Sequence, residues 1–589
     1  MPHAIPAIGQ HTRAPARVRG MPRLLAQAVL LSCAALAGCQ SRTDISATGN
    51  TAAQFTHVYL TINQIWFNTS SAALPTDASW VKFTLSTPQT IDLATLNNGT
   101  LTQFASGLKL AAGTYTQVLL ILADSTDALT GSAQTAGAAS NDEVDYVDAL
   151  DVAHTVPLAV LNAAQGISVS TSLTVAAASS TGIGSLSSSS APTTSSSPTS
   201  SSPTASTFSA PVVATTSAIV DFDATRDLVP IALSGQPAFL LNPHPQAYDI
   251  KYSGSIQGTV SLANVSTVTT ANLPDVQVSA EGLSGDGTRH VIVKTTSINA
   301  SGGFTLYPLS TASGAPGDYD LVIHGPDIAT VIIKSVPVTA GAPGTATTQL
   351  GTVPLTAATS FLVNFDPTSP AAPTSSLIGF YQTLPLASEV PYVVETRAVD
   401  PVSGVFASDQ ALSNGSLQYA TYASGGTVSL TTVTPSQGNA TYSIGAINPA
   451  YGTATLGTTV AAPAAATTTE LFTMTAPPLP PGSVADTIQG TVSVATSAYD
   501  NAELFLTYNG ALVATASLNS YLSGGQNTLT LNAVAPGGSS SATYTAGVYY
   551  AEIWAWNSTN PTGTLTRIPY GSTIDMSAGN ATAVALQIQ

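Results

Sequence analysis

The sequence predicts an all-β protein built from tandem β-sandwich domains that follow an export signal. Apolar and polar residues alternate along most of the chain, for example in Val276–Ala280 and Tyr319–Ile323, and this period of two is typical of strands with one buried face. Turn-forming pairs such as Asn98-Gly99 separate the runs, and no long amphipathic helical pattern interrupts them. Many short strands with frequent turns favour sandwiches.

The chain opens with a pattern that predicts a secretory signal. Four arginines precede a short apolar run, Leu24–Leu36, which ends in small residues before Cys39. The run is too short to span a bilayer, which takes roughly 20 apolar residues. Met21 directly precedes a compact version of the same signal, so the true start is Met1 or Met21.

The residues at the predicted cleavage site, Leu36–Cys39, resemble the lipobox of bacterial lipoproteins. In that motif the cysteine thiol is acylated and the cysteine becomes the new N-terminus. The resemblance therefore implies a lipoprotein signal peptide over residues 1–38 and attachment to a membrane through a lipid on Cys39. The alternative is an ordinary secretion signal with an incidental cysteine. Gln40 stands where an aspartate would retain a lipoprotein in the inner membrane, which implies an outer-membrane location facing the periplasm or the cell surface. We expect residues 39–53 to form a tether.

Cysteine and charged residues are scarce, and this excludes several kinds of site. Since Cys33 lies inside the signal and Cys39 is the predicted acylation site, the folded part has no thiol for catalysis, for cysteine-type zinc sites or for disulfides. From Cys39 onward the chain keeps ten basic and 31 acidic residues, a net charge of −21. Such an acidic surface argues against nucleic acid and against anionic lipid headgroups as partners.

Two internal repeats indicate where domains begin and end. The hexapeptide Ile256–Ser261 recurs as Ile488–Ser493, and each copy is followed about sixty residues later by a Gly-x-Tyr element, which ends in Tyr319 or Tyr549. Glycine turns the chain there, and the tyrosine enters the core with its hydroxyl directed to a backbone partner. We predict a β-rich domain and three sandwiches, bounded at residues 54–250, 251–356, 357–482 and 483–589.

The segment 178–210 departs from the strand pattern. It consists almost entirely of Ser, Thr, Pro and Ala. Because this composition buries too little apolar area to offset the entropy of ordering, we expect a disordered insertion within the first domain. It could carry O-linked sugars, and the alternative is an unmodified flexible loop.

Six segments of the first domain, on both sides of the Ser-rich insertion, share a pattern with a known family. They are Val58–Ile62 with Trp66, Trp80, Ile91–Leu93, Ala112–Leu122, Ala218–Ala224 and Ala238–Pro243. Through these segments the first domain resembles a bacterial family catalogued as domain of unknown function 4382. That family has no assigned chemistry, so the resemblance implies architecture and a surface location only.

The second predicted domain carries four short motifs: Gly258–Val260, Val276–Val278, Gly303-Phe304 and Gly317–Tyr319. With these motifs, residues 253–355 resemble the carboxypeptidase regulatory-like fold, a transthyretin-type sandwich. In proteases that fold is an appendage without catalytic residues, and no peptidase domain accompanies it here. The remaining two predicted domains look like further sandwiches of immunoglobulin-like or transthyretin-like type.

The sequence lacks the motifs of common enzyme classes. It has no His-Glu-x-x-His, no phosphate-binding glycine loop and no Gly-x-Ser-x-Gly elbow. The histidines beyond the signal are scattered singly, which favours surface or strand positions over ligand roles. We therefore expect neither catalysis nor a cofactor.

One acidic run is a candidate metal site. Carboxylates suit calcium, a hard cation, but the run lacks the glycine and the spacing of an EF-hand loop. The alternative, which we favour, is a solvated acidic loop. The candidate ligands are Asp142, Glu143, Asp145, Asp148 and Asp151.

The predicted strand after Gly547 carries the sharpest candidate binding surface. Alternation places Tyr549 on the core face, at the position that corresponds to Tyr319 in the earlier repeat. Aromatic rings beside a carboxylate on the other face would suit sugar rings, and they would equally suit a protein interface. The alternative, which we favour, is that this face packs against a neighbouring domain or a second sheet. The four candidate residues are Tyr550, Glu552, Trp554 and Trp556.

Three functional hypotheses follow, and each keeps membrane attachment through the N-terminal lipid. The first is a surface-exposed, non-catalytic lipoprotein for binding or adhesion, with a glycan or another cell-surface polymer as ligand. The second is a structural or assembly component that acts as a spacer or binds envelope proteins, which burial of Trp554 and Trp556 between domains would favour. The third is an enzyme, which a deep pocket joining two carboxylates at glycosidase-like separation would support.

Overall fold

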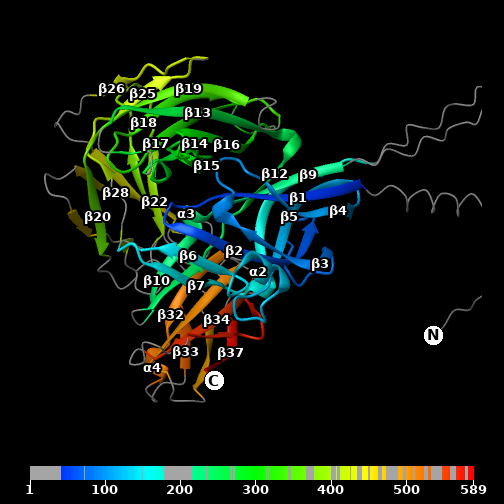
Figure 1. Ribbon diagram of the computed structural model, residues 1–589. Coiled ribbons are helices and arrows are strands. Elements are labelled where there is room, and N and C mark those ends of the chain that lie inside the picture. Colours follow the sequence, from blue (N-terminus) through cyan, green and yellow to red (C-terminus); the bar gives the residue numbers. More distant parts are fainter. Residues whose placement is uncertain are drawn as a thin grey trace, which may run out of the picture.

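The computed structural model of the protein describes residues 41–588 apart from several segments, the longer of which are 178–214, 367–376, 472–487 and 532–546. Most of the described chain is strand, and the described strands form seven separate sheets. The sheets group into one large β domain and three β-sandwiches, here called domains 1 to 4 in chain order (Figure 1). The predicted all-β tandem-sandwich class is confirmed. The predicted signal peptide, Cys39 and the Ser-rich segment lie outside the described residues.

Domain 1 is a single twelve-stranded sheet folded around one apolar core. Its strands are β1 (Ser41–Asn50), β2 (Phe55–Asn68), β3 (Val81–Asp92), β4 (Thr102–Leu110), β5 (Gly113–Leu122), β6 (Glu143–Val147), β7 (Ala153–Val160), β8 (Ile167–Val175), β9 (Thr215–Asp223), β10 (Leu228–Leu233), β11 (Gln236–Leu241) and β12 (Gln246–Asp249). The order across the sheet is β10-β11-β7-β6-β2-β5-β8-β12-β9-β1-β4, with β3 paired to β2.

Strand β1 corrects the predicted tether over residues 39–53. It lies between β9 and β4, parallel to the first and antiparallel to the second, and its Ile45 and Ala47 are buried in the core. The segment has few apolar side chains, so its sequence does not show the strand pattern. It still forms a strand because neighbours on both sides satisfy its backbone hydrogen bonds.

Domain 2 is a sandwich of two sheets. Its strands are β13 (Ser253–Asn264), β14 (Gln277–Leu283), β15 (His290–Ser297), β16 (Gly303–Ser310), β17 (Asp318–His324), β18 (Val331–Pro337) and β19 (Thr347–Thr356). One sheet has the order β16-β13-β19, and the other begins β15-β14-β17-β18. Tyr319 is buried between them, and its hydroxyl donates to the Ser310 carbonyl at 2.7 Å, as expected for the Gly-x-Tyr element.

Domain 3 forms a second pair of sheets and also extends domain 2. Its strands are β20 (Ser360–Asp366), β21 (Leu377–Gln382), β22 (Tyr392–Ala398), β23 (Phe406–Ala407), β24 (Leu412–Ser413), β25 (Gln418–Thr421), β26 (Thr431–Thr432), β27 (Thr441–Asn448), β28 (Gly452–Ala461) and β29 (Thr467–Leu471). The sheets have the orders β23-β20-β24, with β29 paired to β20, and β22-β21-β27-β28. Strand β25 instead pairs with β18, so two strands of this region complete a six-stranded sheet of domain 2.

Domain 4 repeats the topology of domain 2. Its strands are β30 (Ile488–Val494), β31 (Asn501–Tyr508), β32 (Ala511–Ser517), β33 (Thr528–Leu531), β34 (Val548–Trp556), β35 (Thr566–Pro569), β36 (Ile574–Asp575) and β37 (Ala581–Ile588). The order β33-β30-β37 matches β16-β13-β19, and β32-β31-β34-β35 matches β15-β14-β17-β18. In each copy the first strand is antiparallel to one neighbour and parallel to the other.

The glycine of the repeated hexapeptide has the same role in both copies. A Cβ on Gly258 would lie 2.6 Å from the Phe304 ring, and one on Gly490 would lie 1.9 Å from the Val584 carbonyl oxygen. The register of the parallel pair shifts immediately before Gly258 and between Ile488 and Gly490. Only glycine lets the neighbouring strand or ring approach this closely at the irregularity.

The four domains do not form a simple line. Domain 2 packs on domain 1 through a buried ion pair between Lys294 and Asp221, and domain 3 packs on domain 2 through Tyr392, whose ring stacks on His290 with centroids 3.9 Å apart. Domain 4 returns to domain 1 (Figure 1, orange and red beside blue and cyan). Domain 1 therefore contacts both domain 2, which follows it directly, and domain 4, the last of the four.

Helices contribute little to the fold. The α-helices are α2 (Gly131–Ala136), α3 (Ala224–Asp227) and α4 (Asn519–Leu522), and the 3-10 turns are η1 (Leu93–Thr95), η2 (Ala163–Gln165), η3 (Ile250–Tyr252) and η4 (Leu273–Asp275). Within the described part of the chain, none of the helices has the length and apolar character needed to cross a membrane.

Candidate functional site

Strand β34 has the two faces that its alternation predicts. Tyr549, Ala551 and Ile553 belong to the core of domain 4. The opposite face is also buried, because Trp554 is 0% exposed and Trp556 only 9% exposed. Alternation identifies which side chains share a face of a strand, but it carries no information about what covers that face.

The outer face of β34 is covered by domain 1. Trp554 and Trp556 lie in an apolar cluster to which both domains contribute. The predicted exposed sugar-stacking row is therefore wrong for these two residues, because their rings face protein and not solvent. The buried members of the cluster are Ala159, Leu161, Val229, Ile231 and Leu240 of domain 1, with Phe505, Leu512, Trp554 and Trp556 of domain 4.

Beside this cluster, Arg567 of β35 joins the two domains through buried ionic contacts. Its Nε donates to Glu552 Oε1 at 2.6 Å, and its Nη1 donates to Asp124 Oδ1 at 2.8 Å. Its Nη2 donates to the Val160 carbonyl at 2.8 Å. The Arg567 side chain is 7% exposed. One guanidinium thus contacts a carboxylate from each domain and a backbone acceptor of domain 1.

Glu552 has no free oxygen for a ligand. Its Oε1 also accepts from Trp554 Nε1 at 2.8 Å, and its Oε2 accepts from the Asn162 backbone N–H at 3.0 Å. The prediction that Glu552 binds a ligand is therefore corrected, because the carboxylate is fully used in joining domains 1 and 4. Burial alone would lower the pKa of Arg567, but Glu552 and Asp124 outweigh burial and raise the pKa. The guanidinium therefore stays charged.

An open cleft of about 340 Å³ lies where Arg567 joins the domains. This volume is at the lower end of the range for small-molecule sites, about 300–1,000 Å³. Five segments line it: the loop after β5, turn η2, strand β34, strand β35 and the β35–β36 loop. The lining residues are Leu122, Asp124, Thr126, Asp127, Asn162–Gln165, Tyr550, Glu552, Arg567 and Pro569–Thr573.

The cleft is lined by polar groups and by two tyrosines, Tyr550 and Tyr570. Asp127 is exposed and is the lining carboxylate that does not contact Arg567. Gln165 and Tyr570 are half-buried and line the same space. The hydroxyls of Ser572 and Thr573 belong to an exposed loop. The lining thus combines hydrogen-bonding groups, two aromatic rings and an excess of negative charge.

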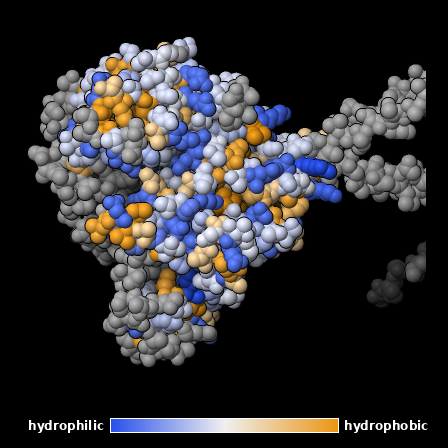
Figure 2. Space-filling model, in the orientation of Figure 1, coloured by the Kyte–Doolittle hydropathy of each residue, from blue (hydrophilic) through white to orange (hydrophobic). Residues whose placement is uncertain are grey.

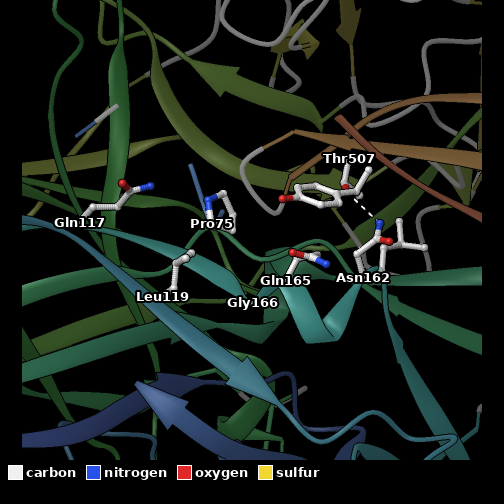
Figure 3. A pocket seen from close by; sticks show the side chains of 9 residues that line it. Pro75, Gln117, Leu119, Asn162, Gln165, Gly166 and Thr507 are labelled. Atoms are coloured by element: carbon white, nitrogen blue, oxygen red, sulfur yellow. Dashed lines mark hydrogen bonds between the residues drawn. The ribbon is translucent and has the colours of Figure 1, made fainter. Parts of the chain in front are cut away.

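A small cavity of about 10 Å³ lies next to the cleft (Figure 3). Asn162 and Thr507 join across the domain contact beside it, at 2.9 Å between Nδ2 and Oγ1. Tyr550 lines both the cavity and the cleft, and its buried hydroxyl has no protein partner among the described residues. The cavity has the volume of about one water molecule, which could complete that hydrogen bond.

Residues 43–243 match the family described as domain of unknown function (DUF4382). The matched region coincides with nearly all of domain 1 and starts within β1, ahead of the predicted domain start at residue 54. A search of the curated proteins found no match.

Several solved structures show weak likeness to the chain. A mutant type II cohesin–X-dockerin complex from Acetivibrio cellulolyticus is 20% identical over 18% of this chain and 58% of its own, with a TM-score of 0.12. The Bacillus anthracis TIE protein is 8% identical over 92% of this chain and 73% of its own, with a TM-score of 0.14. A putative adhesin from Bacteroides ovatus is 8% identical over 57% of this chain and 93% of its own, with a TM-score of 0.11. These scores are too low to support an argument.

The acidic run is not a metal site. No group of three or more His, Cys, Asp or Glu side chains among the described residues could hold a metal ion. The carboxylates instead satisfy backbone donors: Asp142 accepts from the Thr61 N–H, and Glu143 accepts from the Ala139 and Ser140 N–H groups. Burial raises the pKa of Asp142 well above its usual value. Strand geometry and burial thus separate the candidate ligands Asp142, Glu143, Asp145, Asp148 and Asp151.

The C-terminal part of the acidic run forms a hairpin tip. Asp148 accepts from the N–H groups of Leu150 and Val152 and contacts His154 Nε2 at 2.8 Å. The hydrogen bond from His154 and those from the backbone lower the pKa of Asp148. Asp151 adopts a positive φ of 59° in the same turn. These residues shape the β6–β7 turn and do not converge on a common point.

The sequence reasoning missed Arg567 and Asp124. They are separated by more than four hundred residues, and neither belongs to a recognisable motif. The one available signal was the scarcity of basic residues: an arginine close in sequence to a predicted aromatic row, in a chain with few cations, is a candidate partner for the carboxylate in that row.

Proposed function

We propose that this protein is a lipid-anchored, non-catalytic envelope protein that binds a carbohydrate in the cleft between domains 1 and 4. The observation that carries the proposal is the cleft itself, which exists only because domain 4 folds back on domain 1. A protein that served only as a spacer would gain reach from a linear arrangement. The fold-back shortens the molecule and creates a lined, open space.

The chemistry of the cleft favours a neutral polyhydroxylated ligand. Sugar rings stack their C–H faces on aromatic rings and hydrogen-bond to amides and carboxylates, and Tyr570, Gln165 and Asp127 supply these groups. Arg567 is already neutralised by two carboxylates, so Asp127 leaves the cleft with excess negative charge. An anionic ligand would be repelled.

The non-catalytic part of the proposal rests on how the carboxylates are used. Glycosidases need two carboxyl groups that flank the scissile bond and are free to exchange protons. In the cleft, Glu552 and Asp124 are both committed to Arg567. Asp127 is the lining carboxylate that does not contact Arg567, although its Oδ2 accepts from the Asp124 N–H at 3.1 Å, and a single carboxylate suits binding better than hydrolysis.

Anchoring and location are proposed from the N-terminal sequence. The small residues before Cys39 favour acylation, and Gln40 favours transfer to the outer membrane. Metabolic labelling of cells with a radioactive fatty acid would test the anchor, since the Cys39→Ser variant should lose the label. Density-gradient separation of the membranes would test the location.

Retention of the whole mature chain on immobilised neutral polysaccharides tests the binding role. Tyr570→Ala and Asp127→Ala should each reduce retention, because each removes one proposed contact. Tyr252→Ala is the matched control, since this tyrosine is 42% exposed and is not part of the cleft lining. Circular dichroism checks that each variant is folded. No retention of the wild-type chain on any polysaccharide, or equal loss in the Tyr252 control, would contradict the proposal.

A second candidate function is a structural or assembly role, and the burial of Trp554 and Trp556 between domains favours it. The tip of the β6–β7 hairpin offers a contact for another envelope protein, because Leu150 is 82% exposed and Val152 48% exposed. Figure 2 shows an orange patch where Figure 1 places this hairpin. Two results together would favour this role: cross-linking in cells from position 150 to a defined neighbouring protein, and no retention of the chain on any polysaccharide.

A further inference from the structure

The folded part of the chain begins almost at the predicted acylation site. Strand β1 starts at Ser41, so only Gln40 separates it from Cys39. Two residue steps span at most about 7 Å, even when fully extended. A lipid on Cys39 would therefore hold the start of β1 next to the headgroup layer.

Four segments of domain 1 meet at the start of β1, and together they form what we call the anchor end. Ser41 is opposite Leu110 on β4, and its hydroxyl donates to the Ala176 carbonyl at the end of β8. Arg42 is beside Thr215, the first residue of β9. The exposed β4–β5 turn, which contains Ala112, completes this surface.

The anchor end carries two unpaired cations in a strongly acidic protein. Arg42 on β1 is directly opposite Lys109 on β4. Neither forms an ion pair with a described residue, and the nearest acidic residue on β1, Asp44, accepts a hydrogen bond from the Gly107 N–H. Like charges directly opposite each other destabilise an antiparallel pair unless an anion lies between them. Figure 2 shows this tip of the molecule as hydrophilic.

The opposite end of β1 points into the rest of the molecule. Asn50, its last residue, accepts a hydrogen bond from Ser297 of domain 2 at 3.3 Å. Figure 1 shows domains 2, 3 and 4 displaced from the anchor end. A bilayer at the anchor end would therefore meet domain 1, and the other domains would be displaced from it.

From this geometry we propose that the anchor end of domain 1 rests directly on the phospholipid headgroups, with Arg42 and Lys109 against lipid phosphates. The inference rests on the proposed acylation of Cys39 but not on the proposed carbohydrate site. In this arrangement domain 1 contacts the membrane in a fixed orientation, so the cleft between domains 1 and 4 is held at a set distance from the bilayer.

Site-specific fluorescence quenching in reconstituted vesicles tests whether the anchor end contacts the headgroups. The mature chain has no cysteine other than Cys39, so a cysteine introduced at one exposed position takes a label there alone. Lipidated protein labelled at Ala112→Cys, on the anchor end, should lose most of its fluorescence when the vesicles carry a headgroup quencher. The control label at Thr431→Cys, on β26 far from the anchor end in Figure 1, should be unaffected.

Charge variants test the role of the two cations in the same vesicles, made with anionic phospholipid. The double variant Arg42→Gln/Lys109→Gln should weaken the contact between the anchor end and the headgroups. The ratio of protein with this contact to protein without it should fall roughly thirtyfold at low salt, since each basic group near an anionic surface contributes about 1 kcal/mol. Lys82→Gln, which removes an exposed cation elsewhere on domain 1, should leave the ratio unchanged.

The outcomes separate the headgroup contact from the anchor. Mass spectrometry of the purified protein reports acylation directly, and a chain without acyl groups would overturn both proposals. An acylated chain in which the labels at positions 112 and 431 are equally unquenched would overturn the proposed headgroup contact but not the acylation. Quenching at Ala112 that is indifferent to the charge variants would overturn the phosphate contacts of Arg42 and Lys109.

Discussion

Domains 2 and 4 have the same strand topology but use an equivalent outer face on different partners. In domain 2, Val322 of β17 packs outward with Leu384 and Tyr392 of domain 3. In domain 4, Trp554 of β34 packs outward against domain 1. The inner faces are alike, with Tyr319 and Tyr549 in the two cores. The repeat therefore supplies a common core, and the outward residues of one strand decide which domain docks.

The polar contacts at these two faces also differ. Tyr392 donates its hydroxyl to Asp320 of β17 at 2.8 Å, and Lys334 of β18 forms an ion pair with Glu389 of domain 3. Domain 4 meets domain 1 through Arg567 and two carboxylates. Removing one partner of a buried ion pair costs much stability, because an uncompensated buried charge costs more free energy than a lost neutral hydrogen bond. The side chains of Arg567 and Glu552 are 7% and 3% exposed, whereas those of Lys334 and Glu389 are 24% and 11% exposed, so we expect domain 4 to be the more sensitive of the two to single changes.

The largest expected effect is that of Arg567→Met. It leaves Glu552 and Asp124 buried without their cation, which should destabilise the docking of domain 4 by about 3–5 kcal/mol. Urea unfolding, followed by limited proteolysis of domain 4, measures the loss. The triple variant that adds Glu552→Gln and Asp124→Asn should lose less. A single variant as stable as the wild type would show that the ionic contact is dispensable.

Truncating the two equivalent outward faces sharpens the comparison. Trp554→Ala should cost about 3–4 kcal/mol, whereas Val322→Ala should cost about 1–2 kcal/mol, because the indole buries far more apolar surface. Hydrogen exchange should show the first change loosening domain 4 from domain 1 and the second loosening domain 3 from domain 2. Exchange that rises only inside the mutated domain would argue against docking roles for these faces.

The smallest expected effect concerns pH and the contact between domains 1 and 2. Burial raises the pKa of Asp221 from 3.8 to about 6, although Lys294 opposes the shift. The folded protein therefore holds this proton more tightly than the unfolded chain, and Asp221 makes stability fall as the pH rises from 3.8 to about 6. The contribution is at most about 3 kcal/mol.

Asp221→Asn provides the comparison for this pH effect. Melting temperatures of the variant and the wild type, measured across the same pH range, should differ in slope, with the wild type losing stability relative to the variant as the pH rises. The slope is diagnostic, because the variant also leaves Lys294 without its counterion and lowers stability at every pH. Parallel slopes would mean that Asp221 titrates near its ordinary value.

Local patterns in the sequence determined the fold class and the internal repeat. Alternation of period two shows directly in Tyr319–Ile323, and the repeated hexapeptide predicted two related domains that the topology bears out. Both signals depend on neighbours along the chain, and such short-range regularities are visible in a single sequence. The matching alternation in β34 likewise predicted correctly that Tyr549 faces the core.

Tertiary structure alone decided what the predicted surfaces do. Trp554 and Glu552 were assigned to the correct face of their strand, but whether that face meets a ligand or another domain depends on Asp124 and Leu161, which are hundreds of residues away. Strand β1 was missed for the same reason, since the strands that pair with it, β4 and β9, lie elsewhere in the sequence and its own apolar side chains are few. Contacts between distant segments leave no periodic trace in the sequence, so they emerge only when the chain is folded.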